Sequence, residues 1–169
     1  MYRERMETLK EWKVSKNRKP LIIRGARQVG KTWLMKEFGK LYYEKCAYIN
    51  FDNNSRMDIL FNEEFDLDRI IQGLKIESGI NIEPENTLII FDEIQETPKA
   101  LKTLKYFYEN ANEYHIVAAG SLLGVAMHQG TSFPVGKVNF MDLMPLSFFE
   151  FLDALGQEHL LNLLKNNEF

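Results

Sequence analysis

A short glycine-punctuated stretch, residues 25–32, holds the residue types best suited to chemistry in this chain. It reads Gly-Ala-Arg-Gln-Val-Gly-Lys-Thr and fits the spacing G-x-x-x-x-G-K-[ST]. A turn of this kind directs successive backbone N–H groups at an anion, and glycine allows the chain to approach that anion closely. Because an apolar run precedes the stretch and helical spacing follows it, the pattern predicts a polyphosphate-binding loop between a strand and a helix.

The side chains at the end of this loop have expected roles in phosphate chemistry. We expect Lys31 to reach the β- and γ-phosphates as a point charge and the Thr32 hydroxyl to ligate Mg²⁺. The predicted nucleotide contacts are Gly25, Ala26, Arg27, Gln28, Val29, Gly30, Lys31, Thr32 and Trp33.

Two adjacent carboxylates, Asp92 and Glu93, follow an apolar run at residues 88–91. The carboxyl end of a buried parallel strand faces the crevice where such sheets bind ligands. We expect Asp92 to hold Mg²⁺ through water and Glu93 to polarise a water for in-line attack on the γ-phosphorus. Acidic residues are also common at helix N-termini, but the loop upstream favours the hydrolytic interpretation.

The sequence leaves the roles of three further polar residues open. Ser121 follows the apolar run at 116–119 and could touch the γ-phosphate or the attacking water, or it could be a simple turn residue. Gln95 could orient the water or face solvent. Asp52 could activate a substrate hydroxyl if the chain were a kinase.

The elements that must position these residues follow from four short apolar runs. These runs are residues 21–23, 46–51, 88–91 and 116–119. Strands buried on both faces of a parallel sheet have this composition, and only the second run contains polar residues, Tyr48 and Asn50. Helical spacing appears over 55–74 and again after Thr97-Pro98, and a fifth strand is expected near 135–141. The alternation predicts an α/β fold with a mainly parallel five-stranded sheet between helices.

The C-terminal stretch is rich in phenylalanine and leucine. Ser147 and Glu150 have the spacing of a capping box, and Gly156 is a suitable helix stop. We expect a core over 1–146 and a helical segment over 147–169. That segment either packs on the sheet as a hairpin or begins a connection to a further C-terminal domain.

Composition excludes several classes of protein. The 169 residues carry a net charge of −3, so no broad basic field indicates nucleic acid. The single cysteine, Cys46, excludes an intrachain disulfide and a cysteine-based zinc site. No apolar run approaches the roughly 18 residues that span a bilayer, so we expect a cytoplasmic protein without membrane insertion.

Taken together and in this order, the motifs resemble a family of prokaryotic AAA+-like P-loop ATPases. The matching stretches are the loop at 25–32, Phe-Asp-Glu-Ile-Gln at 91–95, Gly-Ser at 120–121 and Leu-Met-Pro-Leu-Ser-Phe-Phe-Glu-Phe-Leu at 143–152. The resemblance spans nearly the whole chain. It implies a three-layer α/β/α sandwich with strand order 5-1-4-3-2, ATP and Mg²⁺ as ligands, and a C-terminal domain that usually follows.

The same resemblance implies roles for individual residues. Nucleotide contacts fall on 25–32, the metal on Thr32 and Asp92, the catalytic base on Glu93 and a γ-phosphate sensor on Ser121. An attached domain or protein partner is implied, a homo-oligomer is possible, and DNA stays open without support from the charge.

One departure concerns turnover. The family usually has Gly-Arg before the fifth strand, whereas this chain has Gly136-Lys137 and no arginine after Arg69. Lysine lacks the forked geometry of an arginine finger, which contributes about 10³–10⁵ in turnover. We therefore expect slow hydrolysis by the isolated chain. A small-molecule or nucleotide kinase and a nucleotide-binding switch with negligible turnover are the alternatives.

Overall fold

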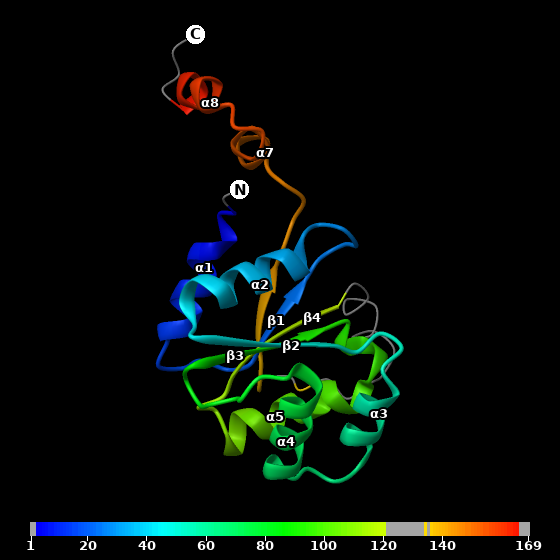
Figure 1. Ribbon diagram of the computed structural model, residues 1–169. Coiled ribbons are helices and arrows are strands. Elements are labelled where there is room, and N and C mark those ends of the chain that lie inside the picture. Colours follow the sequence, from blue (N-terminus) through cyan, green and yellow to red (C-terminus); the bar gives the residue numbers. More distant parts are fainter. Residues whose placement is uncertain (1–2, 121–133, 135, 166–169) are drawn as a thin grey trace.

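The computed structural model describes residues 3–120, 134 and 136–165 of the chain. Its strands are β1 (Leu21–Arg24), β2 (Lys45–Asn50), β3 (Thr87–Asp92), β4 (His115–Gly120) and β5 (Asn139–Asp142). They form one sheet in the order β2-β3-β4-β1-β5, and every neighbouring pair is parallel (Figure 1). Counted from the other edge, this is the order 5-1-4-3-2, so the predicted fold is confirmed.

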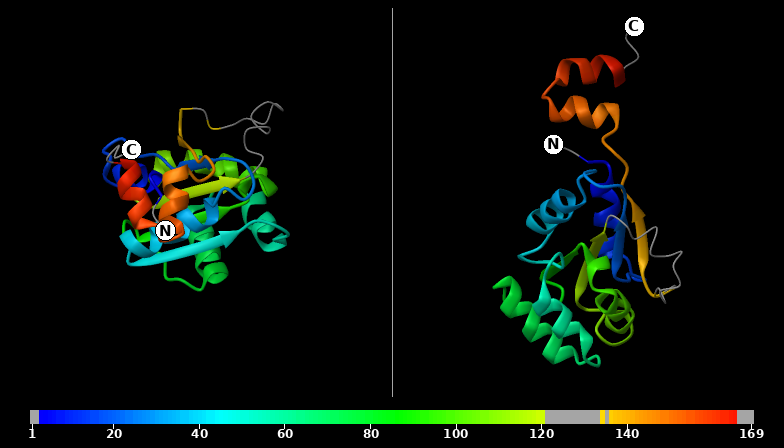
Figure 2. Two further views of the ribbon diagram at one scale, coloured as in Figure 1. Left: turned by 90° about the horizontal axis from the view of Figure 1, so that it is seen from above. Right: turned by 90° about the vertical axis from the view of Figure 1, so that its right-hand side faces the viewer.

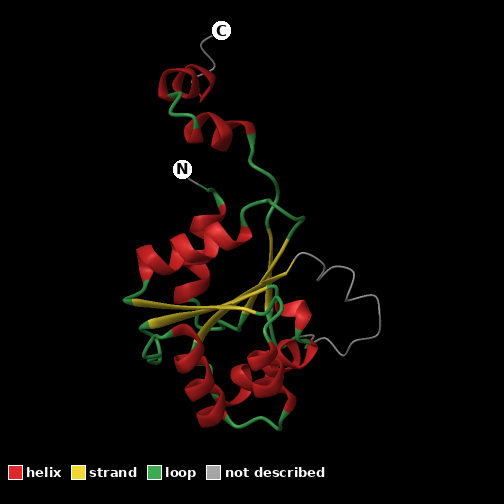
Figure 3. Cartoon of the chain, turned by 45° about the vertical axis from the view of Figure 1, so that its right-hand side comes forward, coloured by secondary structure: helices red, strands yellow, loops and turns green. Residues whose placement is uncertain are grey.

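Helices cover both faces of the sheet and make the structure three layers deep (Figure 3). Helices α1 (Arg5–Val14) and α2 (Lys31–Tyr42) lie on one face. Helices α3 (Ser55–Asn62), α4 (Leu67–Ser78) and α5 (Pro98–Asn110) lie on the other. A short 3₁₀ turn, η1 (Ile94–Glu96), joins β3 to α5.

The central strands bury alternate side chains in two separate cores. In β3, Ile89 and Phe91 pack with α3, α4 and α5, whereas Leu88 and Ile90 pack with α1 and α2. Strands β3 and β4 are buried along their whole length. Because both faces are covered, these strands have no solvent-facing positions, which explains the uninterrupted apolar runs in the sequence.

The helical region predicted over 55–74 is two helices. Helix α3 ends at Asn62, and a new helix begins after Asp66, whose carboxylate accepts a hydrogen bond from the Arg69 backbone N–H at 3.0 Å. This N-cap restarts the helix, which continues to Ser78. No helix of the described part is both long and apolar enough to cross a bilayer.

The C-terminal helices α7 (Phe148–Ala154) and α8 (Glu158–Lys165) pack on each other and stand apart from the sheet (Figure 2). The capping box predicted at the start of α7 is present: the Ser147 hydroxyl accepts from the Glu150 N–H at 3.2 Å, and the Glu150 carboxylate accepts from the Ser147 N–H at 2.9 Å. Helix α7 ends before Gly156, which has φ 70°, as predicted. Because α7 and α8 stand apart from the sheet, they do not pack on it as the hairpin that was one of the two expectations for this segment.

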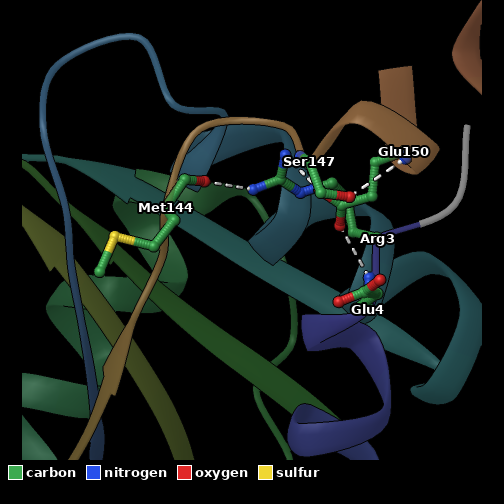
Figure 4. Close-up of polar contacts among 5 residues, drawn as sticks. All are labelled: Arg3, Glu4, Met144, Ser147 and Glu150. Atoms are coloured by element: carbon green, nitrogen blue, oxygen red, sulfur yellow. Dashed lines mark hydrogen bonds and ion pairs between the residues drawn. The ribbon is translucent and has the colours of Figure 1, made fainter. Parts of the chain in front are cut away.

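The N-terminal segment is tied to the start of α7 by a buried ion pair (Figure 4). The Arg3 guanidinium lies 3.4 Å from the Glu150 carboxylate and donates to the Met144 carbonyl at 2.8 Å. The Glu4 backbone N–H donates to the other oxygen of Glu150 at 2.9 Å. Segments about 140 residues apart in the sequence thus share one polar cluster, which we call the Arg3–Glu150 clamp.

Candidate functional site

The glycine-rich loop joins β1 to the first turn of α2, and its two glycines are required for different reasons. Gly30 has φ 91°, a backbone conformation that glycine adopts at little cost. A Cβ on Gly25 would lie 2.4 Å from the Leu143 carbonyl oxygen. The backbone that enforces this contact is fixed by the hydrogen bond from the Leu143 N–H to the Arg24 carbonyl at 2.8 Å. Gly25 is therefore needed for packing against the end of β5, a reason that the sequence did not reveal.

The Lys31 ammonium group lies within the loop. It donates to the carbonyl oxygens of Gly25 at 2.9 Å and Ala26 at 2.7 Å. Burial lowers the pKa of Lys31, while the carboxylates of Glu93 and Asp92 act in the opposite direction. The lysine charge is thus held at the loop and faces the acidic end of β3.

The first turn of α2 meets the end of β3 through a direct hydrogen bond. The Thr32 hydroxyl donates to the Asp92 carboxylate at 2.6 Å, and the Tyr48 hydroxyl donates to the same oxygen at 3.0 Å. Burial, followed by the Asp92 carboxylate, raises the pKa of Tyr48. Sequence reasoning gave Tyr48 no role, although its place as a polar residue inside an apolar strand was a usable signal.

Glu93 directly precedes η1 and has a left-handed backbone conformation, with φ 52° and ψ 41°. A non-glycine residue in this region is uncommon, and such residues gather at functional sites. The Gln95 side-chain amide donates to the Glu93 carboxylate at 2.6 Å. The turn after β3 therefore brings the Glu93 and Gln95 side chains into contact.

These groups surround a cavity of about 570 Å³. Its lining residues are Arg27, Gln28, Gly30, Lys31, Thr32, Trp33, Asp52, Glu93, Gln95 and Glu96. A second hollow of about 540 Å³ adjoins the same loop and is lined by Arg3, Val29, Pro145 and Leu146 together with four residues of the first. Of the predicted nucleotide contacts, six line the first hollow and Val29 lines the second, whereas Gly25 and Ala26 line neither. Glu93 lines the first hollow, and Asp92 is buried behind Thr32. Ser121 lies outside the described residues.

The oxygen atoms at this site fit a magnesium ion that also binds phosphate. The Thr32 hydroxyl and the Asp92 carboxylate place two oxygen atoms side by side, 2.6 Å apart. Within the described residues, no group of three or more His, Cys, Asp or Glu side chains could hold a metal by itself. Mg²⁺ is commonly bound through one or two carboxylates with substrate phosphates and water completing its shell, so the donor set suits it.

Two further polar residues, His115 and Lys137, lie away from this chemistry. His115 is buried beside Trp12 and Tyr43, with its Nδ1 2.7 Å from the Tyr43 hydroxyl. Burial lowers its pKa to about 4. The Lys137 ammonium forms an ion pair with Glu109 of α5 at 3.1 Å. His115 is therefore a core residue, and Lys137 is engaged within its own chain.

The fold and the site together define a class of protein. The sheet is parallel with this strand order, and a glycine-rich loop lies between β1 and α2. A carboxylate at the end of β3 lies beside the loop threonine. This combination is a P-loop NTPase fold. The chain belongs to the AAA domain family, which matches residues 17–152.

Solved structures share the fold at low sequence identity. A Walker-type ATPase of Pyrococcus abyssi superposes with a TM-score of 0.57 at 18% identity, covering 92% of this chain and 58% of its own. The structure of Drosophila ORC bound to DNA superposes with a TM-score of 0.59 at 17% identity, and the match covers 90% of this chain and 45% of the Drosophila chain. Aeropyrum pernix ORC2 in its ADP form superposes with a TM-score of 0.57 at 17% identity, and the match covers 92% of this chain and 52% of the ORC2 chain. The chain thus spans about half the length of these proteins. No curated protein matches it in sequence.

Proposed function

We propose that the chain is an Mg²⁺-dependent ATP-binding and ATP-hydrolysing module that couples its nucleotide state to an attached domain or a protein partner. The observation that carries the proposal is the 2.6 Å hydrogen bond between Thr32 and Asp92 at the cavity that Lys31 lines. It supports a shared site in which a loop cation, a hydroxyl and a carboxylate receive a triphosphate and its metal.

Each residue has a distinct task in this proposal. The loop N–H groups and the Lys31 ammonium bind the phosphates, and Thr32 and Asp92 hold Mg²⁺, which neutralises charge on the phosphate oxygens. Glu93 accepts a proton from the attacking water. Ser121 remains predicted as the γ-phosphate sensor.

Coupling to a partner is supported by the C-terminal helices. On α7, Phe148, Phe149 and Phe151 are exposed by 60%, 41% and 47%. We propose that the segment 147–169 connects the core to a further domain or a partner, and an assembly of several copies is compatible with this. The similar structures share only the fold, and the net charge of −3 does not favour DNA, so DNA is left out of the proposal.

Trp33 offers a direct test because it lines the cavity, whereas the other tryptophan, Trp12, is buried in the core. Fluorescence titration with MgATP and MgGTP measures binding, and phosphate release measures turnover. We expect saturable MgATP binding and slow hydrolysis. The Glu93→Gln variant should bind ATP but release about 10²–10⁴-fold less phosphate. Absence of nucleotide binding by the wild-type chain would refute the proposal.

A kinase is the second candidate, because Asp52 is exposed and lines the same cavity as Lys31. In that case phosphate release would be negligible, and the γ-phosphoryl group would move to an added hydroxyl acceptor. Binding without either reaction would favour a nucleotide-dependent switch.

A further inference from the structure

We propose that Gln95 holds the attacking water together with Glu93 and so acts directly in the hydrolytic step. This inference rests on the proposed ATP hydrolysis. Gln95 lies in η1 and is one of the residues that line the cavity, together with Lys31, Thr32 and Glu93. A residue in that position faces the space in which the γ-phosphate and its nucleophile must meet.

The chemistry of the neighbouring carboxylate fixes the orientation of the Gln95 amide. Its nitrogen lies 2.6 Å from a Glu93 oxygen and 3.4 Å from a Glu96 oxygen. Because a carboxylate only accepts hydrogen bonds, the NH₂ group must point towards these two acids. The carbonyl oxygen of Gln95 is therefore turned the other way.

That carbonyl oxygen is buried and has no hydrogen-bond partner in the described part of the chain. No other buried side-chain nitrogen or oxygen of the described residues lacks a partner. A buried acceptor without a donor costs free energy. In a native structure such an atom is commonly explained by a catalytic role or by a bound water. Because the oxygen is fully buried, a water reaches it only after a small shift of the Gln95 side chain within the site, and that water would then supply the missing donor.

A water held by both side chains is oriented for attack. It donates one proton to the Glu93 carboxylate and the other to the Gln95 oxygen, which leaves a lone pair for the γ-phosphorus. In the reaction a bond forms from the water oxygen to the γ-phosphorus, and the bond from that phosphorus to the bridging oxygen breaks. The proton passes to Glu93, and the products are ADP and inorganic phosphate. The strained backbone at Glu93 is consistent with a pair that is held in place for catalysis.

The experiment compares Gln95→Met, Glu93→Gln and the double variant, with Gln72→Met on the exposed side of α4 as a matched control. Phosphate release gives kcat, and Trp33 fluorescence gives ATP affinity. We expect Gln95→Met to lower kcat about 10- to 100-fold while ATP affinity changes less than about threefold. Since both residues act on one water, the double variant should be no slower than Glu93→Gln alone, within about threefold.

Several outcomes would overturn the inference while leaving the proposed function intact. These are a kcat for Gln95→Met within twofold of wild type, losses that multiply in the double variant, or a loss of ATP binding with Gln95→Met, which would mark a structural role. If Gln95→Met does not fold, Gln95→Asn takes its place, because it keeps the amide but withdraws the carbonyl by one methylene. If the wild-type chain binds ATP and releases no phosphate, the proposed hydrolysis fails and this inference fails with it.

Discussion

Replacing Arg3 by methionine should destabilise the junction between the core and α7. Arg3 and Glu150 are only 3% and 7% exposed, so neither charge is well solvated. Removing one partner of a buried ion pair costs about 3–5 kcal/mol, because the other charge is left unpaired. Glu150 keeps two backbone donors, from Glu4 and Ser147. We therefore expect the lower end of that range, about 3 kcal/mol, if α7 unfolds together with the core.

Two measurements report this loss of stability, one for the whole chain and one for the Arg3–Glu150 clamp alone. For a chain of this size, 1 kcal/mol shifts Tm by about 2–4 °C, so the variant should melt about 6–12 °C lower. Amide hydrogen exchange reports the clamp locally, through the N–H groups of Glu4 and Ser147 that donate to Glu150. A loss of about 3 kcal/mol corresponds to faster exchange by about two powers of ten at these amides.

A double-mutant cycle with Glu150→Gln separates the ion pair from general damage. Once Glu150 is neutral, Arg3→Met should cost at least about 1 kcal/mol less than it does in the wild-type chain. Additive losses, or a Tm within about 1 °C of wild type for Arg3→Met, would show that the two charges are not coupled and would refute the reasoning.

Three further substitutions test other features of the structure. Gly25→Ala should destabilise the fold by about 1–3 kcal/mol in denaturant unfolding, because its Cβ would lie 2.4 Å from the Leu143 carbonyl; wild-type stability would contradict the close contact. His115 has a pKa lowered from 6.5 to about 4, so the unfolded chain binds more protons between these values, and its contribution to stability is complete above pH 6.5 and is lost as the pH falls towards 4. Between pH 7 and 4.5 the wild-type free energy of unfolding should therefore fall by roughly 2–3 kcal/mol. This fall should be absent from His115→Gln, which keeps a hydrogen-bonding group for Tyr43, and parallel pH curves would contradict the prediction. Lys31→Met should weaken MgATP binding at least about tenfold in the Trp33 titration while the fold is retained, and unchanged affinity would exclude Lys31 as a phosphate ligand.

Local sequence patterns predicted the strands, the loop and the capping box because each depends on residues close together in the chain. The apolar runs in β3 and β4 have no solvent-facing positions, so their burial could be predicted without knowing their neighbours. The capping box is contained in four residues, 147–150. The strand order was available only from the resemblance to a family, since periodicity does not determine which strands pair.

Contacts between distant segments could not be predicted in this way. Arg3 lies in a charged N-terminal stretch of the kind that usually faces solvent, and only the fold brings it to Glu150. Tyr48 differs, because a polar residue within a buried strand requires a hydrogen-bond partner, although the sequence does not show that this partner is Asp92.

The contact between Gly25 and Leu143 has a mechanical consequence. Leu143 follows β5 and begins the stretch that leads to α7, and its peptide group bonds to Arg24 and abuts Gly25. A displacement of the chain just after β5 is therefore transmitted to the base of the glycine-rich loop through the Leu143 peptide group. Because the Gly25 carbonyl also accepts a hydrogen bond from the Lys31 ammonium, such a displacement acts on the residue that positions the lysine.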